Sequence, residues 1–164
     1  EHSLEVAFIA HAFGIINNEI YDGNICPERL AILGMYHDVT EIITGDMPTP
    51  VKYYSSVIRN AYAEVECVAK DELLTGLPQV MQRYYDNVLL ETKEEEYLWK
   101  YVKAADKMSA LIKCIEEEQM GNKDFLDAKN TIEKTLKEMN LPEVNYFMSE
   151  FLPAYQLTLD ESGK

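Results

Sequence analysis

The stretch that decides the fold is MYHDVTEIITGD, residues 35–46. It continues an apolar pattern in which Leu30, Leu33 and His37 recur at i, i+3 and i+7. This spacing places the imidazole on the apolar stripe of an amphipathic helix. The pattern predicts one helix over residues 27–44, with a histidine and an aspartate side by side within it.

The rest of the chain also has helical periodicity, and no segment alternates for long with the period of a half-buried strand. Pro27 suits a first helical residue, Gly45 can end a helix in a left-handed cap, and Thr92 with Glu95 predicts a capping box. The sequence predicts an all-α fold, a helical bundle forming a single domain over residues 1–164. The other expected helices cover residues 4–16, 53–75, 79–90, 92–120, 124–139 and 143–151.

Composition limits the classes of partner. The chain has 164 residues, 47% of them hydrophobic, and a formal net charge of −14. Such an acidic balance argues against nucleic-acid polymers and anionic membranes as partners, because both require a basic surface. No run of about 18 apolar residues suggests a membrane span. Three widely spaced cysteines are typical of buried thiols in a reducing compartment, so we expect a cytoplasmic protein.

Residues 35–46 also predict a site. His37 and Asp38 are costly to bury, and polar groups placed in a core pattern usually bind something. Glu41 follows one helical turn after His37, and Asp46 falls on a loop stiffened by two prolines. Asp106 lies in an apolar stretch beside two alanines, although an exposed aspartate paired with a neighbouring lysine explains its spacing about as well.

Several motifs resemble those of one known family. His2, the His37-Asp38 pair and Asp106 have the order and helical context of the HD-domain phosphohydrolases, and in particular of the bacterial 5′-deoxynucleotidases. The similarity extends over essentially the whole chain. The motifs that carry it are EHSL at 1–4, MYHD at 35–38, GDMPTPVKY at 45–53, KAAD at 103–106 and YFM at 146–148.

The resemblance implies a metal-dependent hydrolase that removes the 5′-phosphate from deoxyribonucleoside 5′-monophosphates. It implies that one divalent ion is held by two imidazoles and two carboxylates, and that Glu41 assists the attacking water. Such a donor set suits Co, Mn, Mg or Fe better than a structural zinc site. It also implies a homodimer, for which the apolar residues after 139 are a plausible interface. The implied metal ligands are His2, His37, Asp38 and Asp106, and the implied substrate contacts are His2, Asp46, Met47, Pro48, Thr49 and Asp106.

One feature of the family has no counterpart in this sequence. In the family an arginine–tryptophan pair, upstream of the first metal histidine, orients the phosphate, whereas this chain starts at Glu1 inside a helical pattern. We therefore expect an upstream segment to be absent from it. Two alternatives remain open at this point: another HD-type phosphohydrolase acting on a signalling nucleotide, and a non-catalytic helical protein with a structural metal.

Overall fold

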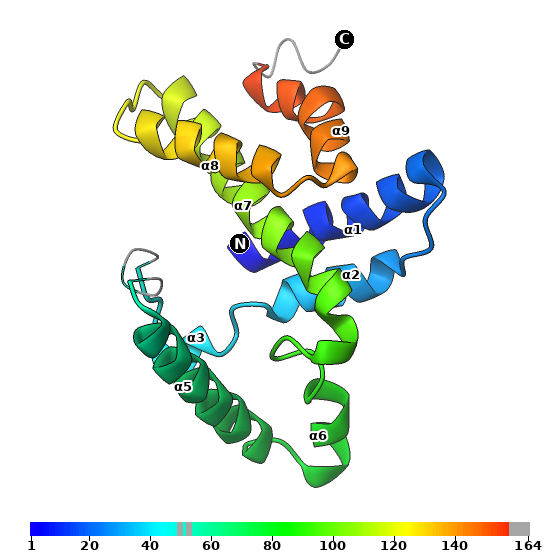
Figure 1. Cartoon of the computed structure of the whole chain (residues 1–164), viewed down its shortest axis with the longest axis vertical. Helices are drawn as coiled ribbons and strands as arrows, with labels where there is room; N and C mark the ends of the chain where they lie inside the picture. Colours follow the sequence, from blue (N-terminus) through cyan, green and yellow to red (C-terminus); the bar gives the residue numbers. More distant parts are fainter. Residues whose placement is uncertain (49–50, 52–53, 158–164) are drawn as a thin grey trace. The chain divides into compact units, whose positions relative to one another are not determined.

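The computed structural model describes residues 1–48, 51 and 54–157. These residues form helices joined by turns and contain no strand, which confirms the predicted all-α class (Figure 1). They divide into two compact units. The first comprises Glu1–Gly34 and the chain from Tyr97 onward, and the second comprises Met35–Glu96. The single domain over residues 1–164 stays a prediction.

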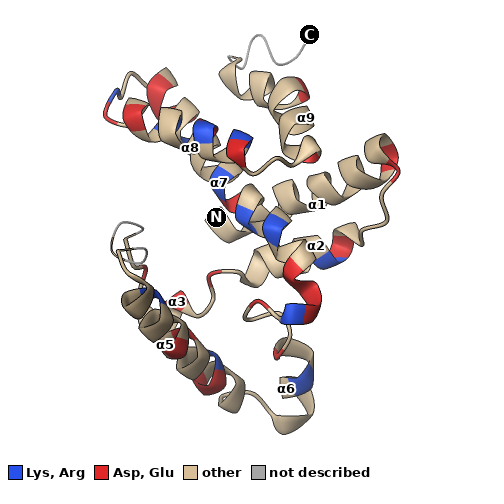
Figure 2. Ribbon diagram, viewed as in Figure 1, with Lys and Arg blue, Asp and Glu red and all other residues tan. Residues whose placement is uncertain are grey.

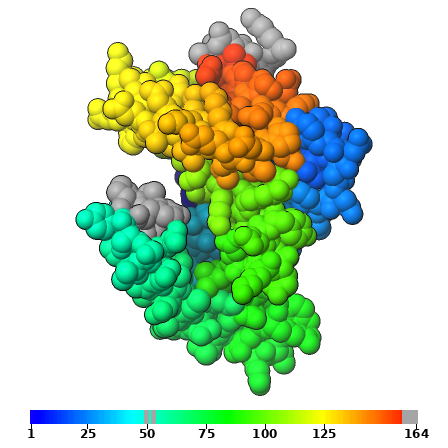
Figure 3. Space-filling view, in the orientation of Figure 1, coloured from blue at the N-terminus to red at the C-terminus, as the bar shows by residue number. Residues whose placement is uncertain are grey.

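The first unit is a packed group of helices. Helix α9 lies against α1, α8 and the short 3-10 helix η2 (Figure 1), and the space-filling view shows the side chains of α8 and α9 in contact (Figure 3). Its largest fully buried side chains include Phe13, Leu30, Leu33, Met108 and Ile112. The elements are α1 (His2–Tyr21), α2 (Pro27–Tyr36, of which the last two residues belong to the second unit), α7 (Glu96–Gln119, in this unit from Tyr97), α8 (Leu126–Glu138), α9 (Pro142–Glu150) and η2 (Leu152–Gln156).

A buried polar cluster joins three helices of this unit. Asn17 of α1 donates its side-chain amide to Glu143 Oε1 of α9 at 2.5 Å. The hydroxyl of Tyr101, on α7, donates to the same carboxylate oxygen at 3.1 Å. Glu143 is only 2% exposed, and a carboxylate at such a depth requires donors of this kind. The cluster therefore links α1, α7 and α9 through Oε1 of Glu143, whereas the buried Oε2 has no hydrogen-bond partner among the described residues.

The second unit is built on α5 (Ser56–Thr75), which contacts α3 (Glu41–Thr44) and α6 (Gln79–Tyr85). The hydroxyl of Ser55 caps α5 by accepting the Ile58 amide at 3.2 Å. An ion pair of 2.6 Å joins Lys70 of α5 to Asp86, just after α6. A 3-10 turn, η1 (Lys93–Glu95), closes the unit before α7.

The prediction of one continuous helix over residues 27–44 is wrong. Helix α2 ends at Tyr36, residues 37–40 form a turn, and α3 is a separate single turn of helix. The Val39 amide donates to the Tyr36 carbonyl at 3.1 Å and the Glu41 amide to the Asp38 carbonyl at 2.9 Å. These bonds span three residues instead of four, so the helical register changes at the His-Asp pair.

Other predicted boundaries also shift. Helix α5 begins at Ser56, and the expected start at residue 53 lies outside the described residues. Helix α6 ends at Tyr85, five residues before the expected end at Leu90. The capping box is wrong, because Thr92 makes no side-chain cap bond and precedes a 3-10 turn. Beyond residue 151 the chain forms η2, because Pro153 occupies the first turn of a new short helix, where proline is tolerated.

Charges on the outer helices follow the expected solvated pattern. Acidic and basic residues both occur along α8 (Figure 2), where Lys134 and Glu138 form an i,i+4 pair at 3.8 Å. Among the residues that the structure describes, no helix combines the length and the apolar character needed to cross a membrane.

Candidate metal centre

The first predicted pair of ligands joins α1 to α7. His2 is the first residue of α1, and its Nε2 lies 3.1 Å from Oδ1 of Asp106 on α7. The two side chains are 45% and 42% exposed. Both groups are therefore open to an ion from solution while their helices hold them in place.

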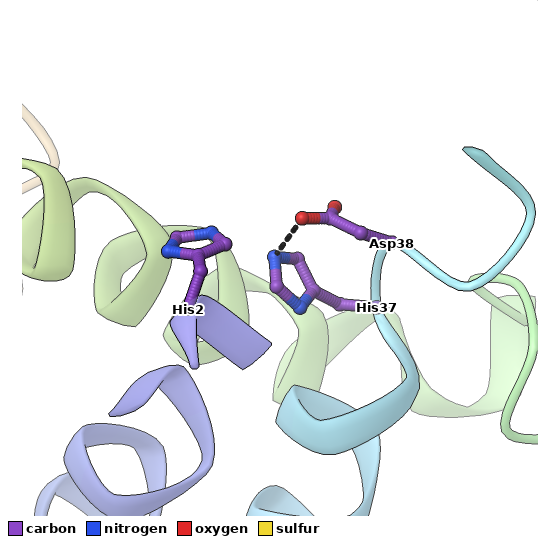
Figure 4. Close-up of side chains that lie close together, drawn as sticks. All are labelled: His2, His37 and Asp38. Carbon is purple, nitrogen blue, oxygen red and sulfur yellow. Dashed lines mark ion pairs between the residues drawn. The ribbon is translucent and has the colours of Figure 1, made fainter. Parts of the chain in front are cut away.

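The second pair lies in the turn that follows α2. His37 Nε2 is 2.9 Å from Asp38 Oδ2 (Figure 4). The imidazole of His37 is only 8% exposed, whereas the carboxylate of Asp38 is 34% exposed. Because the helix ends at Tyr36, the two adjacent side chains need not diverge by the 100° of a continuous helix. The turn thus brings together two groups that helical geometry would have rotated apart.

The two pairs share a spacing that fits metal coordination. Ligands at about 2.1 Å from one ion, at right angles to each other, are separated by about 3 Å. The observed separations of 3.1 Å and 2.9 Å match that edge of an octahedron. Imidazole nitrogens and carboxylate oxygens are also the donors that first-row divalent ions accept. The residues present therefore fit a divalent ion.

The predicted base and substrate loop follow in the second unit. Glu41 opens α3, and its backbone amide bonds to the Asp38 carbonyl, which fixes the two residues relative to each other. Gly45 ends α3 with φ 72° and ψ 159°. Its positive φ agrees with the expected glycine stop, but its ψ lies outside the left-handed helical region. Asp46 is exposed beyond it.

The loop at Gly45 is held by a residue that the sequence did not indicate. The hydroxyl of Tyr62, a buried residue of α5, donates to the Gly45 carbonyl at 3.1 Å and lies 3.3 Å from the hydroxyl of Thr44. This contact anchors the start of the predicted substrate loop. Met47 and Pro48 follow in the described part of the loop, whereas Thr49 lies outside the described residues.

Two further polar residues next to His2 were missed. Ser109 Oγ lies 3.0 Å from His2 Nδ1 and 2.6 Å from Glu5 Oε2. Their sequence signal is spacing: Glu5 follows His2 by three residues on α1, and Ser109 follows Asp106 by three on α7. Residues three apart on a helix share a face. This spacing makes Glu5 and Ser109 compatible with a role beside the ligands, but only tertiary packing selects them among the polar residues of the two helices.

One aromatic contact lies directly before the second pair in the chain. Tyr36, directly before His37, meets Tyr85 of α6 edge to face, with ring centroids 5.8 Å apart. Burial, with a smaller contribution from Tyr85, raises the pKa of Tyr36 above its usual value. Tyr85 therefore packs against the residue that directly precedes His37, which is a common role for such a residue.

Comparison with known proteins decides the family. The model of the YfbR-like 5′-deoxynucleotidases matches residues 1–155. The chain belongs to this family. A 5′-deoxynucleotidase of Photobacterium profundum is 46% identical over 163 residues, covering 98% of this chain and 83% of that protein. Another, of Pectobacterium atrosepticum, is 45% identical over 161 residues, covering 98% and 81%.

A solved structure agrees with the fold. An HD-domain phosphohydrolase of Listeria innocua superposes with a TM-score of 0.77 at 27% identity, covering all of this chain and 79% of that one. The resemblance inferred from the His-Asp pair and its companion motifs is thereby confirmed, as is the all-α HD fold. Membership of this family also favours a metal-dependent hydrolase over the non-catalytic alternative.

Proposed function

We propose that this chain removes the 5′-phosphate from deoxyribonucleoside 5′-monophosphates, using a single divalent ion held by His2, His37, Asp38 and Asp106. The activity is that of its family and of the relatives that match 98% of the chain. The observation that carries the ligand set is the repeated imidazole–carboxylate separation of 3.1 Å and 2.9 Å. The first three of these ligands are the side chains drawn in Figure 4.

Chain connectivity supports the use of both pairs by one ion. Gly34 lies against α1, because a Cβ placed on it would be 3.0 Å from Cα of Ala7. His2 precedes Ala7 by five residues, about 7.5 Å along a helix. His37 follows Gly34 by three residues, which span at most about 11 Å. Both imidazoles are thus tethered close to the same helix contact.

The reaction requires little covalent chemistry from the protein. A bound divalent ion lowers the pKa of its water and neutralises phosphate charge. Glu41 then orients the attacking water and accepts its proton as the new P–O bond forms. The bond from phosphorus to the 5′ oxygen breaks, and that oxygen takes a proton from solvent water to leave as the nucleoside hydroxyl, while Glu41 returns its proton to solvent. Positioning and charge stabilisation suffice for such a transfer.

The residues after Gly45 provide the proposed contacts to the nucleotide. Asp46 can accept a hydrogen bond from a sugar hydroxyl, and Met47, Pro48 and Thr49 form the loop beside it. We propose that close packing around the 2′ position rejects ribose, and that His2 and Asp106 also touch the substrate. Support for a shaped loop comes from the Tyr62 hydroxyl, which fixes its first residue.

The finer features of the enzyme are also proposals. The donor set contains no thiolate, which favours Co, Mn, Mg or Fe over structural zinc. We propose a cytoplasmic homodimer that binds neither nucleic-acid polymers nor membranes. Much of the apolar C-terminal segment is buried within its own unit, including Val144 and Phe147. The exposed large hydrophobic residues that the structure describes in this segment are Phe151, Tyr155 and Leu157, at 46%, 37% and 47% exposed, and these support an interface there.

Phosphate release from a panel of deoxy- and ribonucleoside monophosphates tests the function. Release should stop on complete chelation and return with Mn, Co or Mg. Glu41→Gln should retain the ion but lose turnover by about 10²–10⁴-fold, the usual contribution of a general base. Glu64→Gln, which changes an exposed glutamate of α5, is the matched control. Activity that survives chelation would refute the metal mechanism, and equal rates on both sugars would refute only the sugar specificity.

A further inference from the structure

We infer that Ser109 and Glu5 position His2 for the metal by fixing which of its ring nitrogens carries the proton. This inference rests on the proposed function, in which His2 is a metal ligand. The three side chains form a continuous chain: His2 Nδ1 is 3.0 Å from Ser109 Oγ, and Ser109 Oγ is 2.6 Å from Glu5 Oε2. Ser109 is 2% exposed, so solvent competes little for its hydroxyl.

The direction of each hydrogen bond follows from the donors present. An ionised carboxylate only accepts, and a serine hydroxyl has one hydrogen to give. The short contact of 2.6 Å assigns that hydrogen to Glu5 Oε2. The remaining bond must then run from Nδ1–H of His2 to a lone pair of Ser109. This places the proton of the neutral ring on Nδ1 and makes Nε2 the acceptor nitrogen of the ring.

Nε2 is the nitrogen that faces the other proposed ligand of this pair. His2 Nε2 lies 3.1 Å from Asp106 Oδ1. In the tautomer set by Ser109, this contact joins two acceptors, which repel each other unless a cation lies between them. A divalent ion satisfies both at once, whereas the opposite tautomer would fill the position with a proton. Glu5 and Ser109 therefore prepare the His2–Asp106 pair for a metal.

The hydrogen-bonded series of Glu5, Ser109 and His2 depends on the three-residue spacing along helices α1 and α7. Glu5 lies three residues after His2, and Ser109 three residues after Asp106, so the relay runs one turn beyond the ligands on each helix. Outer partners of this kind orient ligating histidines, and their loss typically weakens metal binding 10–100-fold. Ser109 and Glu5 act through His2 in this role and do not need to contact the nucleotide.

Variants at position 5 separate the tautomer effect from simple loss of structure. Glu5→Ala removes the acceptor, so the Ser109 hydroxyl becomes free to donate to Nδ1 and allows the wrong tautomer. Glu5→Gln keeps a carbonyl oxygen there and should retain most of the effect. Titration calorimetry with MnCl₂ should show about 10–100-fold weaker binding for Glu5→Ala and for Ser109→Ala. Glu5→Gln and the exposed control Glu19→Ala should remain within a few-fold of the wild type.

Nitrogen-15 NMR of the histidine rings reads the tautomer without any metal. The chain has only three histidines, so their signals can be assigned by substitution. With neutral rings, we expect His2 to be protonated on Nδ1 in the wild type and Glu5→Gln, and to be a mixture of tautomers in Glu5→Ala. Thermal unfolding should show that Glu5→Ala remains folded.

The two readouts keep this inference distinct from the proposed function. Wild-type protein that binds no Mn and releases no phosphate would overturn the proposed function, while the tautomer measurement would still decide the relay. A wild-type His2 protonated on Nε2 would overturn the relay whatever the activity. So would Mn affinity in Glu5→Ala equal to that of Glu5→Gln and Glu19→Ala.

Discussion

Two single residues donate hydrogen bonds to the buried carboxylate of Glu143. Glu143 sits in the core of the first unit, and the structure gives it donors from Asn17 and from Tyr101. Burial, followed by the neighbouring Glu143 carboxylate, raises the pKa of Tyr101 well above its usual value. The phenol therefore stays neutral in the folded protein at neutral and mildly alkaline pH.

The raised pKa of Tyr101 predicts an alkaline loss of stability. Above pH 10, the usual value for tyrosine, the unfolded chain releases the phenolic proton while the folded chain retains it. The unfolded state then binds fewer protons, so the free energy of unfolding falls as pH rises. Tyr101→Phe should lower stability by about 1–2 kcal/mol at neutral pH, through loss of a hydrogen bond to a carboxylate. It should also flatten the decline above pH 10.

Urea unfolding from pH 7 to 11 measures both effects. Tyr54→Phe removes a hydroxyl from a side chain that is 81% exposed and is the matched control. The stability difference between wild type and Tyr101→Phe should shrink above pH 10. A difference that stays constant across this range would show that the Tyr101 proton does not contribute to the pH dependence.

Residues also differ in how visible they are in the sequence. His37 and Asp38 were predictable because charged groups in an apolar pattern are rare, and His2 and Asp106 because ordered motifs of a family accompany them. Ser109, Glu5 and Tyr62 were not, since hydroxyls and glutamates are common on helices and only tertiary packing selects these. The proposed ligands were therefore visible in the sequence, and the residues that hold them in place were not.

At the scale of elements, the break between α2 and α3 is the main departure from prediction. Leu33, His37 and Glu41 keep the four-residue spacing of a helix across residues 37–40, so periodicity alone could not reveal the turn. The existence and order of the long helices α1, α5 and α7 were predicted, because their periodic patterns span several turns. Helix ends depend on individual backbone bonds and were predicted less well. The turn matters chemically because it carries one of the two proposed ligand pairs.

The contact between α1 and α2 should tolerate no side chain at Gly34. A Cβ there would lie 3.0 Å from Cα of Ala7 and 3.2 Å from the Val6 carbonyl oxygen, and backbone atoms cannot rotate away. Gly34→Ala should therefore push the helices apart and lower stability by about 1–3 kcal/mol. Because His37 follows three residues later, the same change should weaken Mn binding.

A second glycine provides the comparison. Gly76 ends α5 with φ −69°, and a Cβ there would be 3.4 Å from the nearest atom, the Leu73 carbonyl oxygen. Gly76→Ala should be neutral or should stabilise by up to about 1 kcal/mol. Urea unfolding and Mn calorimetry on both variants test the contrast. Gly34→Ala with wild-type stability would mean that α1 and α2 pack less closely than the structure indicates.

At the scale of the whole molecule, net charge acts on the metal and on the nucleotide with opposite signs. The charge of −14 produces a negative potential that concentrates divalent cations and repels a phosphate monoester. Salt screens both effects, with a Debye length of about 10 Å at 0.1 M. Raising KCl from about 20 to 200 mM should therefore weaken Mn binding, by roughly threefold or more. At saturating Mn, the same change should raise kcat/KM for the deoxynucleotide.

A charge variant distinguishes this long-range field from direct competition by K⁺ at the ligands. Asp71→Asn with Glu72→Gln removes two exposed carboxylates of α5 and changes the net charge from −14 to −12. If the field acts as proposed, this variant binds Mn slightly more weakly at low salt and depends less steeply on KCl. Calorimetry and initial rates across the salt series give both slopes for each protein. Direct competition would leave the two salt slopes equal, and an Mn affinity independent of KCl would show that the overall charge does not reach the site.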